Sequence, residues 1–83
     1  MNINKQRLLD SQDMGLAVAL LCNEYQLAEL ERPEYGGRVT FRFVLAEGID
    51  QAAQDYWNGK LEVDAKRYWS EAKNLKTRLY SLK

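Results

Sequence analysis

The side chains of this protein best suited to chemistry are its carboxylates. Two acidic pairs, Glu29 with Glu31 and Asp50 with Asp55, have the residue type that general acid and base catalysis uses. The chain contains no histidine, and neither pair is accompanied by a nucleophile, a phosphate-binding loop or a set of metal-binding residues. We therefore predict a protein that is not an enzyme and that has no catalytic residue, cofactor or metal site.

The thiol of Cys22 is the other reactive group, and it stands alone. A single cysteine cannot form a disulfide within the chain. It ends an apolar run over residues 16–22, far shorter than the ~20 residues that cross a bilayer. We interpret Cys22 as a small apolar residue packed inside a helix. We also expect a cytoplasmic protein that does not bind membranes.

Positive charge is concentrated near the C-terminus, although the whole chain has no net charge. Residues 60–83 contain seven basic and three acidic residues, whereas residues 1–59 contain five and nine. The helix predicted in residues 60–83 could contact nucleic-acid phosphates or an acidic protein surface with this charge. Alternatively, its basic side could be an ordinary solvated face. The candidate nucleic-acid contacts are Lys66, Lys73, Lys76 and Arg78 at this end, together with Arg38 and Arg42 of a predicted strand.

Four aromatic residues gather around the connection between two predicted helices. They are Tyr56, Trp57, Tyr68 and Trp69. Tyr68 and Trp69 are separated by about 100° around a helix, so the four cannot all face inward. Tryptophan and tyrosine are favoured anchors of protein interfaces, and the alternative is packing in the core. Trp57, Trp69 and Tyr68 are therefore the candidate interaction residues.

Alternating side chains over residues 38–45 predict a β-strand. The alternation places Phe41 and Phe43 on one face and Arg38 and Arg42 on the other. Residues 25–31 form a weaker strand candidate, and the intervening Pro33-Glu34-Tyr35-Gly36-Gly37 supplies a turn. The two strands together predict an antiparallel β-hairpin.

Three helices complete the predicted fold. Residues 12–22, capped by Ser11, form the first, and the apolar spacing after Ile49 predicts a second over residues 49–57. The third begins after Asp64 and carries a heptad seam. We predict one α+β domain over residues 11–83, with the helices packed on one face of the hairpin, preceded by a flexible arm over residues 1–10.

Two features of this fold favour a homodimer. The open edge of the hairpin could pair with a second copy into a larger sheet, and the heptad seam could pair two helices. The alternative is that the seam packs on the hairpin of its own chain, which we favour because the pattern is short. The seam residues are Ala65, Tyr68, Ala72, Leu75, Leu79 and Leu82.

Four segments in this order, residues 13–21, 39–43, 56–64 and 75–80, resemble a family of short uncharacterised bacterial and phage proteins, a domain of unknown function. The most specific is the Tyr-Trp-Asn-Gly block at residues 56–59, just before the last helix. The resemblance covers roughly residues 11–80. It implies a bacterial or phage origin and a shared fold, and it brings no catalytic residues.

The sequence thus favours a small non-catalytic interaction protein that associates with itself and binds a protein partner. The alternative is a nucleic-acid-binding accessory protein that uses the basic C-terminal helix.

Overall fold

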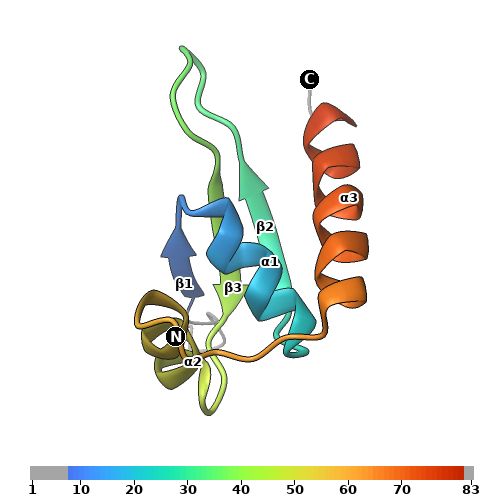
Figure 1. Ribbon diagram of the computed structural model, residues 1–83. Helices are drawn as coiled ribbons and strands as arrows, with labels where there is room; N and C mark the ends of the chain where they lie inside the picture. The colour runs from blue at the N-terminus through green and yellow to red at the C-terminus, as the bar shows by residue number, and fades with distance from the viewer. Residues whose placement is uncertain (1–7, 82–83) are drawn as a thin grey trace, which may run out of the picture.

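The computed structural model describes residues 8–81 as three strands and three helices (Figure 1). The elements follow the order β1 (Leu8–Ser11), α1 (Met14–Cys22), β2 (Leu27–Glu31), β3 (Thr40–Val44), α2 (Ile49–Trp57) and α3 (Ala65–Ser81). This arrangement confirms the predicted α+β class.

The three strands form one antiparallel sheet in the order β1-β3-β2. On one side of β3, Leu9 pairs with Phe43, and on the other side Leu30 pairs with Phe41. A bulge interrupts the pairing of β2 between Leu27 and Glu29. The predicted hairpin is therefore present, with β3 in the centre rather than at an edge.

The first strand corrects one prediction. We expected residues 1–10 to be a flexible arm, but residues 8–10 belong to β1 and pair with β3. The pairing satisfies backbone groups that a two-stranded hairpin would leave open along β3. The remaining part of the predicted arm, residues 1–7, lies outside the described residues.

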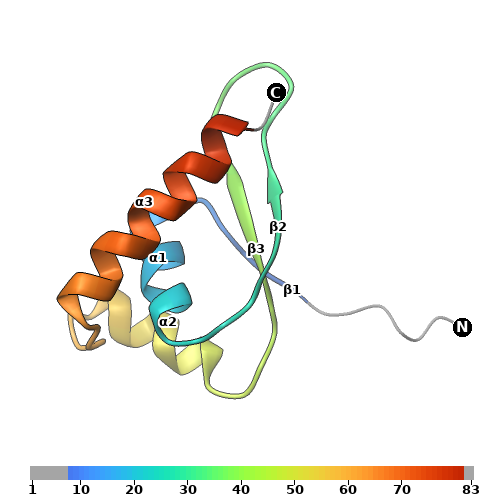
Figure 2. The same ribbon diagram turned by 90° about the vertical axis from the view of Figure 1, so that its right-hand side faces the viewer.

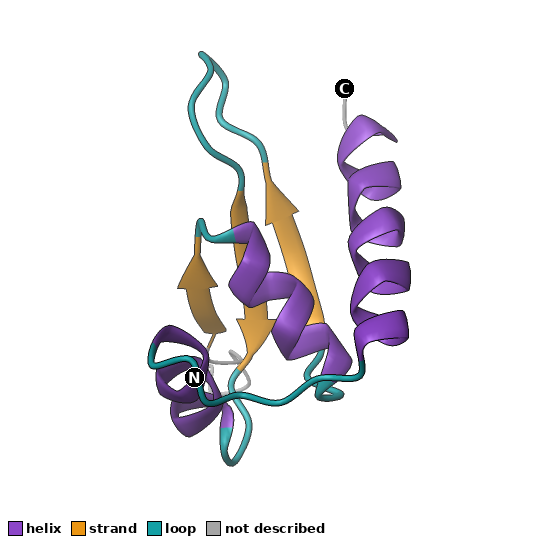
Figure 3. Cartoon of the chain, viewed as in Figure 1, coloured by secondary structure: helices purple, strands orange, loops and turns teal. Residues whose placement is uncertain are grey.

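All three helices lie on one face of the sheet, as predicted (Figures 2 and 3). In β3, Phe41 and Phe43 point to the helices and are buried, whereas Arg42 lies on the opposite face and is half-buried. The alternation thus has the predicted direction, and each buried large apolar side chain contributes about 1.5–3 kcal/mol. The largest fully buried side chains are Phe43, Leu16, Leu20, Ile49, Leu75 and Val18.

The ends of the helices follow local capping chemistry. Helix α1 starts two residues later than predicted, because Asp13 rather than Ser11 caps it by accepting the amide of Leu16 at 3.2 Å. Ser11 is instead the last residue of β1, and its hydroxyl accepts the amide of Asp13. The predicted cap of α3 is confirmed, since a carboxylate oxygen of Asp64 accepts the amide of Arg67 at 2.9 Å.

Most of the heptad seam of α3 packs on its own chain. Leu75 is buried, and Tyr68, Ala72 and Leu79 lie half-buried against the same core. Near the end of α3, the guanidinium of Arg32 donates to the carbonyl of Leu79 at 2.7 Å. The seam is therefore used inside the chain, as we favoured, although α3 packs mainly on α1 rather than directly on the hairpin. Leu82 lies outside the described residues.

Candidate interaction site

A groove of about 420 Å³ lies beside α1, between residues of α2 and α3. Helix α1 contributes Ala19, and α2 contributes Tyr56. The connection from α2 to α3 adds Leu61 and Val63, and α3 adds Ala65 and Tyr68. The lining residues are Ala19, Tyr56, Leu61, Val63, Ala65 and Tyr68. The groove is thus mainly apolar, and the two tyrosines are its only lining residues with a polar group in the side chain.

Tyr56 forms one wall of this groove, and the sequence of α1 makes room for it. A Cβ atom on Gly15 would collide with the hydroxyl of Tyr56, so glycine lets this side chain lie against the first turn of α1. Burial raises the pKa of the Tyr56 hydroxyl, and the neighbouring Asp13 and Tyr68 raise it further. The hydroxyl is therefore neutral at physiological pH and remains a hydrogen-bond donor.

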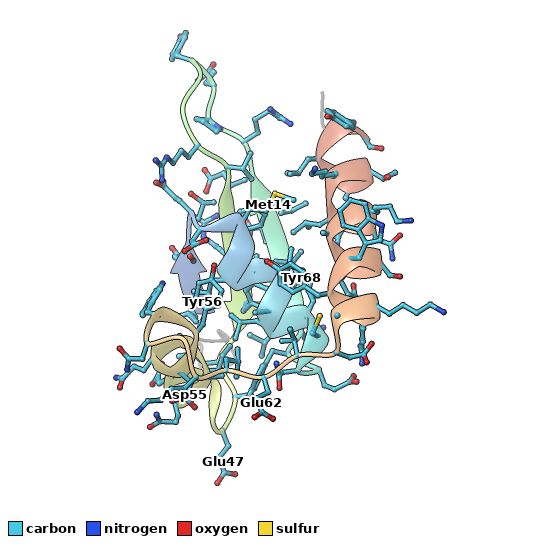
Figure 4. All side chains as sticks on the ribbon, viewed as in Figure 1. Met14, Glu47, Asp55, Tyr56, Glu62 and Tyr68 are labelled. Atoms are coloured by element: carbon cyan, nitrogen blue, oxygen red, sulfur yellow. The ribbon has the colours of Figure 1, made fainter. Side chains whose placement is uncertain are left out.

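Tyr68 forms the facing wall. Figure 4 shows Tyr56 coming from α2 and Tyr68 from α3 on the two sides of α1. Tyr68 is half-buried, and part of its surface belongs to the core. Of the predicted interaction residues it is the one that lines the groove. Sequence reasoning missed Tyr56 as its counterpart, because the helical spacing of Tyr56 is that of a core residue.

Both tryptophans are exposed to solvent. Trp57 is 61% exposed and Trp69 is 60% exposed, values that are high for the largest apolar side chain. Trp57 ends α2, directly after Tyr56, and Trp69 directly follows Tyr68 in α3. Each tryptophan thus neighbours a groove-lining tyrosine in the chain while its own side chain faces solvent.

The basic residues proposed for nucleic-acid contact fall into two separate groups. Lys66, Lys73, Lys76 and Arg78 are all exposed on α3. Arg42 lies instead on the face of the sheet that the helices leave uncovered, and Arg38 is exposed just before β3. The fold therefore places Arg42 on a surface separate from that of the helix residues.

Arg42 is engaged by three carboxylates. Its guanidinium forms ion pairs with Asp10 of β1 at 3.3 Å, with Glu29 of β2 at 3.2 Å and with Glu31 of β2. The hydrogen bond with Glu31 is the main cause that raises the pKa of Arg42. A phosphate would have to displace these carboxylates, so the arrangement disfavours Arg42 as a nucleic-acid contact.

Arg67 holds the start of α3 to the end of α1. It bonds a carboxylate oxygen of Glu24 at 2.6 Å and lies 3.5 Å from that of Glu71. Nearby, Cys22 is half-buried, and burial followed by the charge of Glu71 raises the pKa of its thiol. Cys22 is therefore a protonated, weakly reactive thiol at neutral pH.

Within residues 8–81, no group of three or more histidine, cysteine, aspartate or glutamate side chains is arranged so that it could hold a metal ion. No helix in the same range has the length and apolarity to cross a membrane.

Comparison with curated proteins and with solved structures found no match to this chain. One family model matches residues 7–81, which include every helix and strand described above. The predicted resemblance to an uncharacterised domain family is thus confirmed. The chain belongs to that family, which is described as a domain of unknown function (DUF5659).

Proposed function

We propose that this protein is a non-catalytic interaction module that binds a protein partner through the groove between Tyr56 and Tyr68. An apolar side chain of the partner enters the groove, and the two hydroxyls bond polar atoms beside it. The observation that carries the proposal is the mainly apolar groove of about 420 Å³ walled by two tyrosines. This volume lies within the range of roughly 300–1,000 Å³ found for small-molecule pockets, so the groove has room for an apolar side chain.

The residue types at the groove support a protein partner. Tyrosine supplies a large contact area together with a hydrogen-bonding tip, and it is enriched where interfaces gain most of their energy. Trp57, exposed and adjacent in sequence to Tyr56, adds a further aromatic anchor. We propose that Trp57 contacts the partner beside the groove. Trp69 instead lies among the basic residues of α3.

We propose that the protein is bacterial or phage-encoded, cytoplasmic and non-catalytic. A bacterial or phage origin follows from the sequence resemblance, and a cytoplasmic location fits a chain with the single, half-buried Cys22. The absence of catalysis rests on the lack of histidine and of a convergent nucleophile in the sequence.

We also propose a homodimer that pairs through a sheet edge, because most of the described heptad seam packs inside the chain. Strands β1 and β2 are the two edges. Strand β2 carries a bulge and two charged residues, Glu29 and Glu31, whereas β1 has no bulge and one charged residue, Asp10, so we propose β1 as the paired edge. Sedimentation equilibrium checks this point: a mass of about twice 9.7 kDa supports the dimer, and the monomer mass contradicts it.

Peptide selection tests the groove directly. A random peptide library displayed on phage is selected against the purified protein, and the enriched peptides are synthesised and titrated. We expect them to share an apolar residue. The Ala65→Phe variant should then lose at least tenfold in affinity, because Ala65 is exposed at the groove and its larger replacement occupies the space.

Two further variants make the test specific. Ala46→Phe makes the same substitution at an exposed position that does not line the groove, and it should retain affinity within about twofold. Tyr68→Phe removes one hydroxyl and should weaken binding by about 0.5–1.5 kcal/mol. Peptides that bind Ala65→Phe as tightly as the unmodified protein, or a selection that enriches no peptide, would contradict the proposal.

A further inference from the structure

The charged side chains exposed on α3 are all basic. From Ala65 to Ser81, all described, the exposed side chains include four basic residues and no acidic one. The one acidic residue in this range, Glu71, is half-buried beside Arg67. Figure 2 shows α3 at the outside of the helical layer, with one side toward α1 and the other free. This side therefore presents uncompensated positive charge.

Part of this charge is arranged in a line with aromatic rings. At about 100° per residue, the five side chains of this line fall within roughly 80° around the helix axis. All five are exposed, with Trp69 at 60% and Tyr80 at 79%. We call this line the basic-aromatic stripe. Its members are Lys66, Trp69, Lys73, Lys76 and Tyr80.

Two details separate the stripe from a merely solvated helix face. The ammonium of Lys73 lies 5.6 Å from the centre of the Trp69 ring, so charge and ring are held together. No lysine of the stripe forms an ion pair with any of residues 8–81. Arg78, the fourth exposed basic residue, projects about 180° from Trp69 and is not part of the stripe.

We propose that the basic-aromatic stripe binds single-stranded nucleic acid. Lysines meet the phosphates, and Trp69 and Tyr80 offer ring faces on which unpaired bases stack. A single strand presents both charged phosphates and exposed base faces, whereas a duplex hides the faces of its bases. This surface is separate from the tyrosine groove, so the inference does not rest on the proposed function.

Other acidic ligands match the stripe less well. An acidic protein surface would use the lysines but gives no reason for two exposed aromatic rings between them. An anionic membrane needs a continuous apolar helix face to insert, and the apolar face of α3 packs in the core. The aromatic residues of the stripe are instead separated by lysines.

Fluorescence anisotropy with a labelled oligothymidylate of about 20 nucleotides tests the proposal. This length exceeds the roughly 4–16 nucleotides that one small single-strand-binding domain covers. Each phosphate contact contributes about −0.7 to the slope of log affinity against log salt for a single strand. Three lysines predict a slope of about −2, so affinity should fall about 20-fold between 50 and 200 mM salt.

Variants separate the stripe from general charge. In Lys73→Gln/Lys76→Gln, the dependence of log affinity on log salt should become shallower, with a slope of about −0.7. Affinity at low salt should drop at least tenfold. Arg78→Gln removes one charge from the same helix outside the stripe, and it should change affinity less than twofold. Trp69→Ala should reduce affinity about fivefold or more, because it removes a stacking surface and no charge. Circular dichroism and the urea midpoint establish that each variant is folded.

Four results would overturn the inference. The first is undetectable binding of the oligonucleotide at about 50 mM salt. The second is an equal loss of affinity in Arg78→Gln and in Lys73→Gln/Lys76→Gln. The third is unchanged affinity in Trp69→Ala, and the fourth is tighter binding of a matched duplex. Binding to vesicles containing phosphatidylserine without binding to the oligonucleotide would assign the stripe to membranes and equally reject the proposal.

Discussion

The contact between Gly15 and Tyr56 gives the sharpest test of how the groove is built. In the Gly15→Ala variant the new methyl group meets the Tyr56 hydroxyl, and its Cβ would also lie 3.3 Å from the ring carbon Cζ. Tyr56 must then move away from α1, which displaces one wall of the groove. We expect lower stability and weaker binding of the selected peptides from the same substitution.

The magnitude follows from two opposing effects. Overpacking of a well-packed site costs about 1–3 kcal/mol. Alanine in place of glycine within a helix contributes about 0.5–1 kcal/mol of stability, and Gly15 lies in α1. The net expectation is a loss of about 1 kcal/mol in the free energy of unfolding, although the same substitution at an unobstructed helical glycine would stabilise the protein.

A double-mutant cycle measured by urea unfolding isolates the contact. Tyr56→Phe removes the hydroxyl and leaves only the 3.3 Å approach of the ring carbon, so Gly15→Ala in that background should change the free energy of unfolding by less than about 1 kcal/mol. The coupling between the two sites should then be about 1 kcal/mol. If Gly15→Ala alone stabilises the protein and the coupling is below about 0.5 kcal/mol, the Tyr56 hydroxyl does not rest against Gly15.

Three other substitutions test the charged contacts. Arg42→Met leaves three carboxylates facing one another, so the urea midpoint of the variant should fall at low salt and recover partly in high salt. Equal midpoints for the variant and the unmodified protein at low salt would contradict this network. The hydrogen bond from Arg67 lowers the pKa of Glu24. The ion pair therefore stabilises the folded protein at neutral pH, and this contribution is lost as pH falls through the lowered pKa. Glu24→Gln should therefore be less stable than the unmodified protein at neutral pH and equal to it in acid, and a constant difference would reject this linkage. Glu71→Gln removes a charge that raises the pKa of Cys22, so alkylation of the thiol at neutral pH should become faster; an unchanged or slower rate would show that Glu71 does not act on it.

Elements with a strong repeating pattern could be predicted from the sequence. The alternation around Phe41 and Phe43 gave the central strand and its buried face, and the apolar spacing after Ile49 gave α2. Strand β1 could not be found in this way, because its four residues, Leu-Leu-Asp-Ser, show no alternation. Only their pairing with a strand some 30 residues away makes them extended, and that pairing also removes Ser11 from the helix cap.

The candidate site was predictable only where local helical geometry decides which side chains are exposed. Helical geometry excluded the burial of both Tyr68 and Trp69, and the structure leaves Trp69 exposed and Tyr68 half-buried. The groove itself depends on how α2 and α3 converge on α1. Tyr56 becomes a groove wall through its long-range contact with Gly15, which no local spacing encodes. Likewise, no local pattern in the sequence identifies the partners of Arg42, because only strand pairing brings its three carboxylates together.

The central claim, that the tyrosine groove receives a partner's apolar side chain, can be measured directly. A ¹H–¹⁵N correlation spectrum of the labelled protein is recorded while a selected peptide is added. We predict that the largest chemical-shift changes fall on the residues that line the groove, Ala19, Tyr56, Leu61, Val63, Ala65 and Tyr68. Changes confined to the uncovered face of the sheet around Arg42, with the groove residues unmoved, would contradict it.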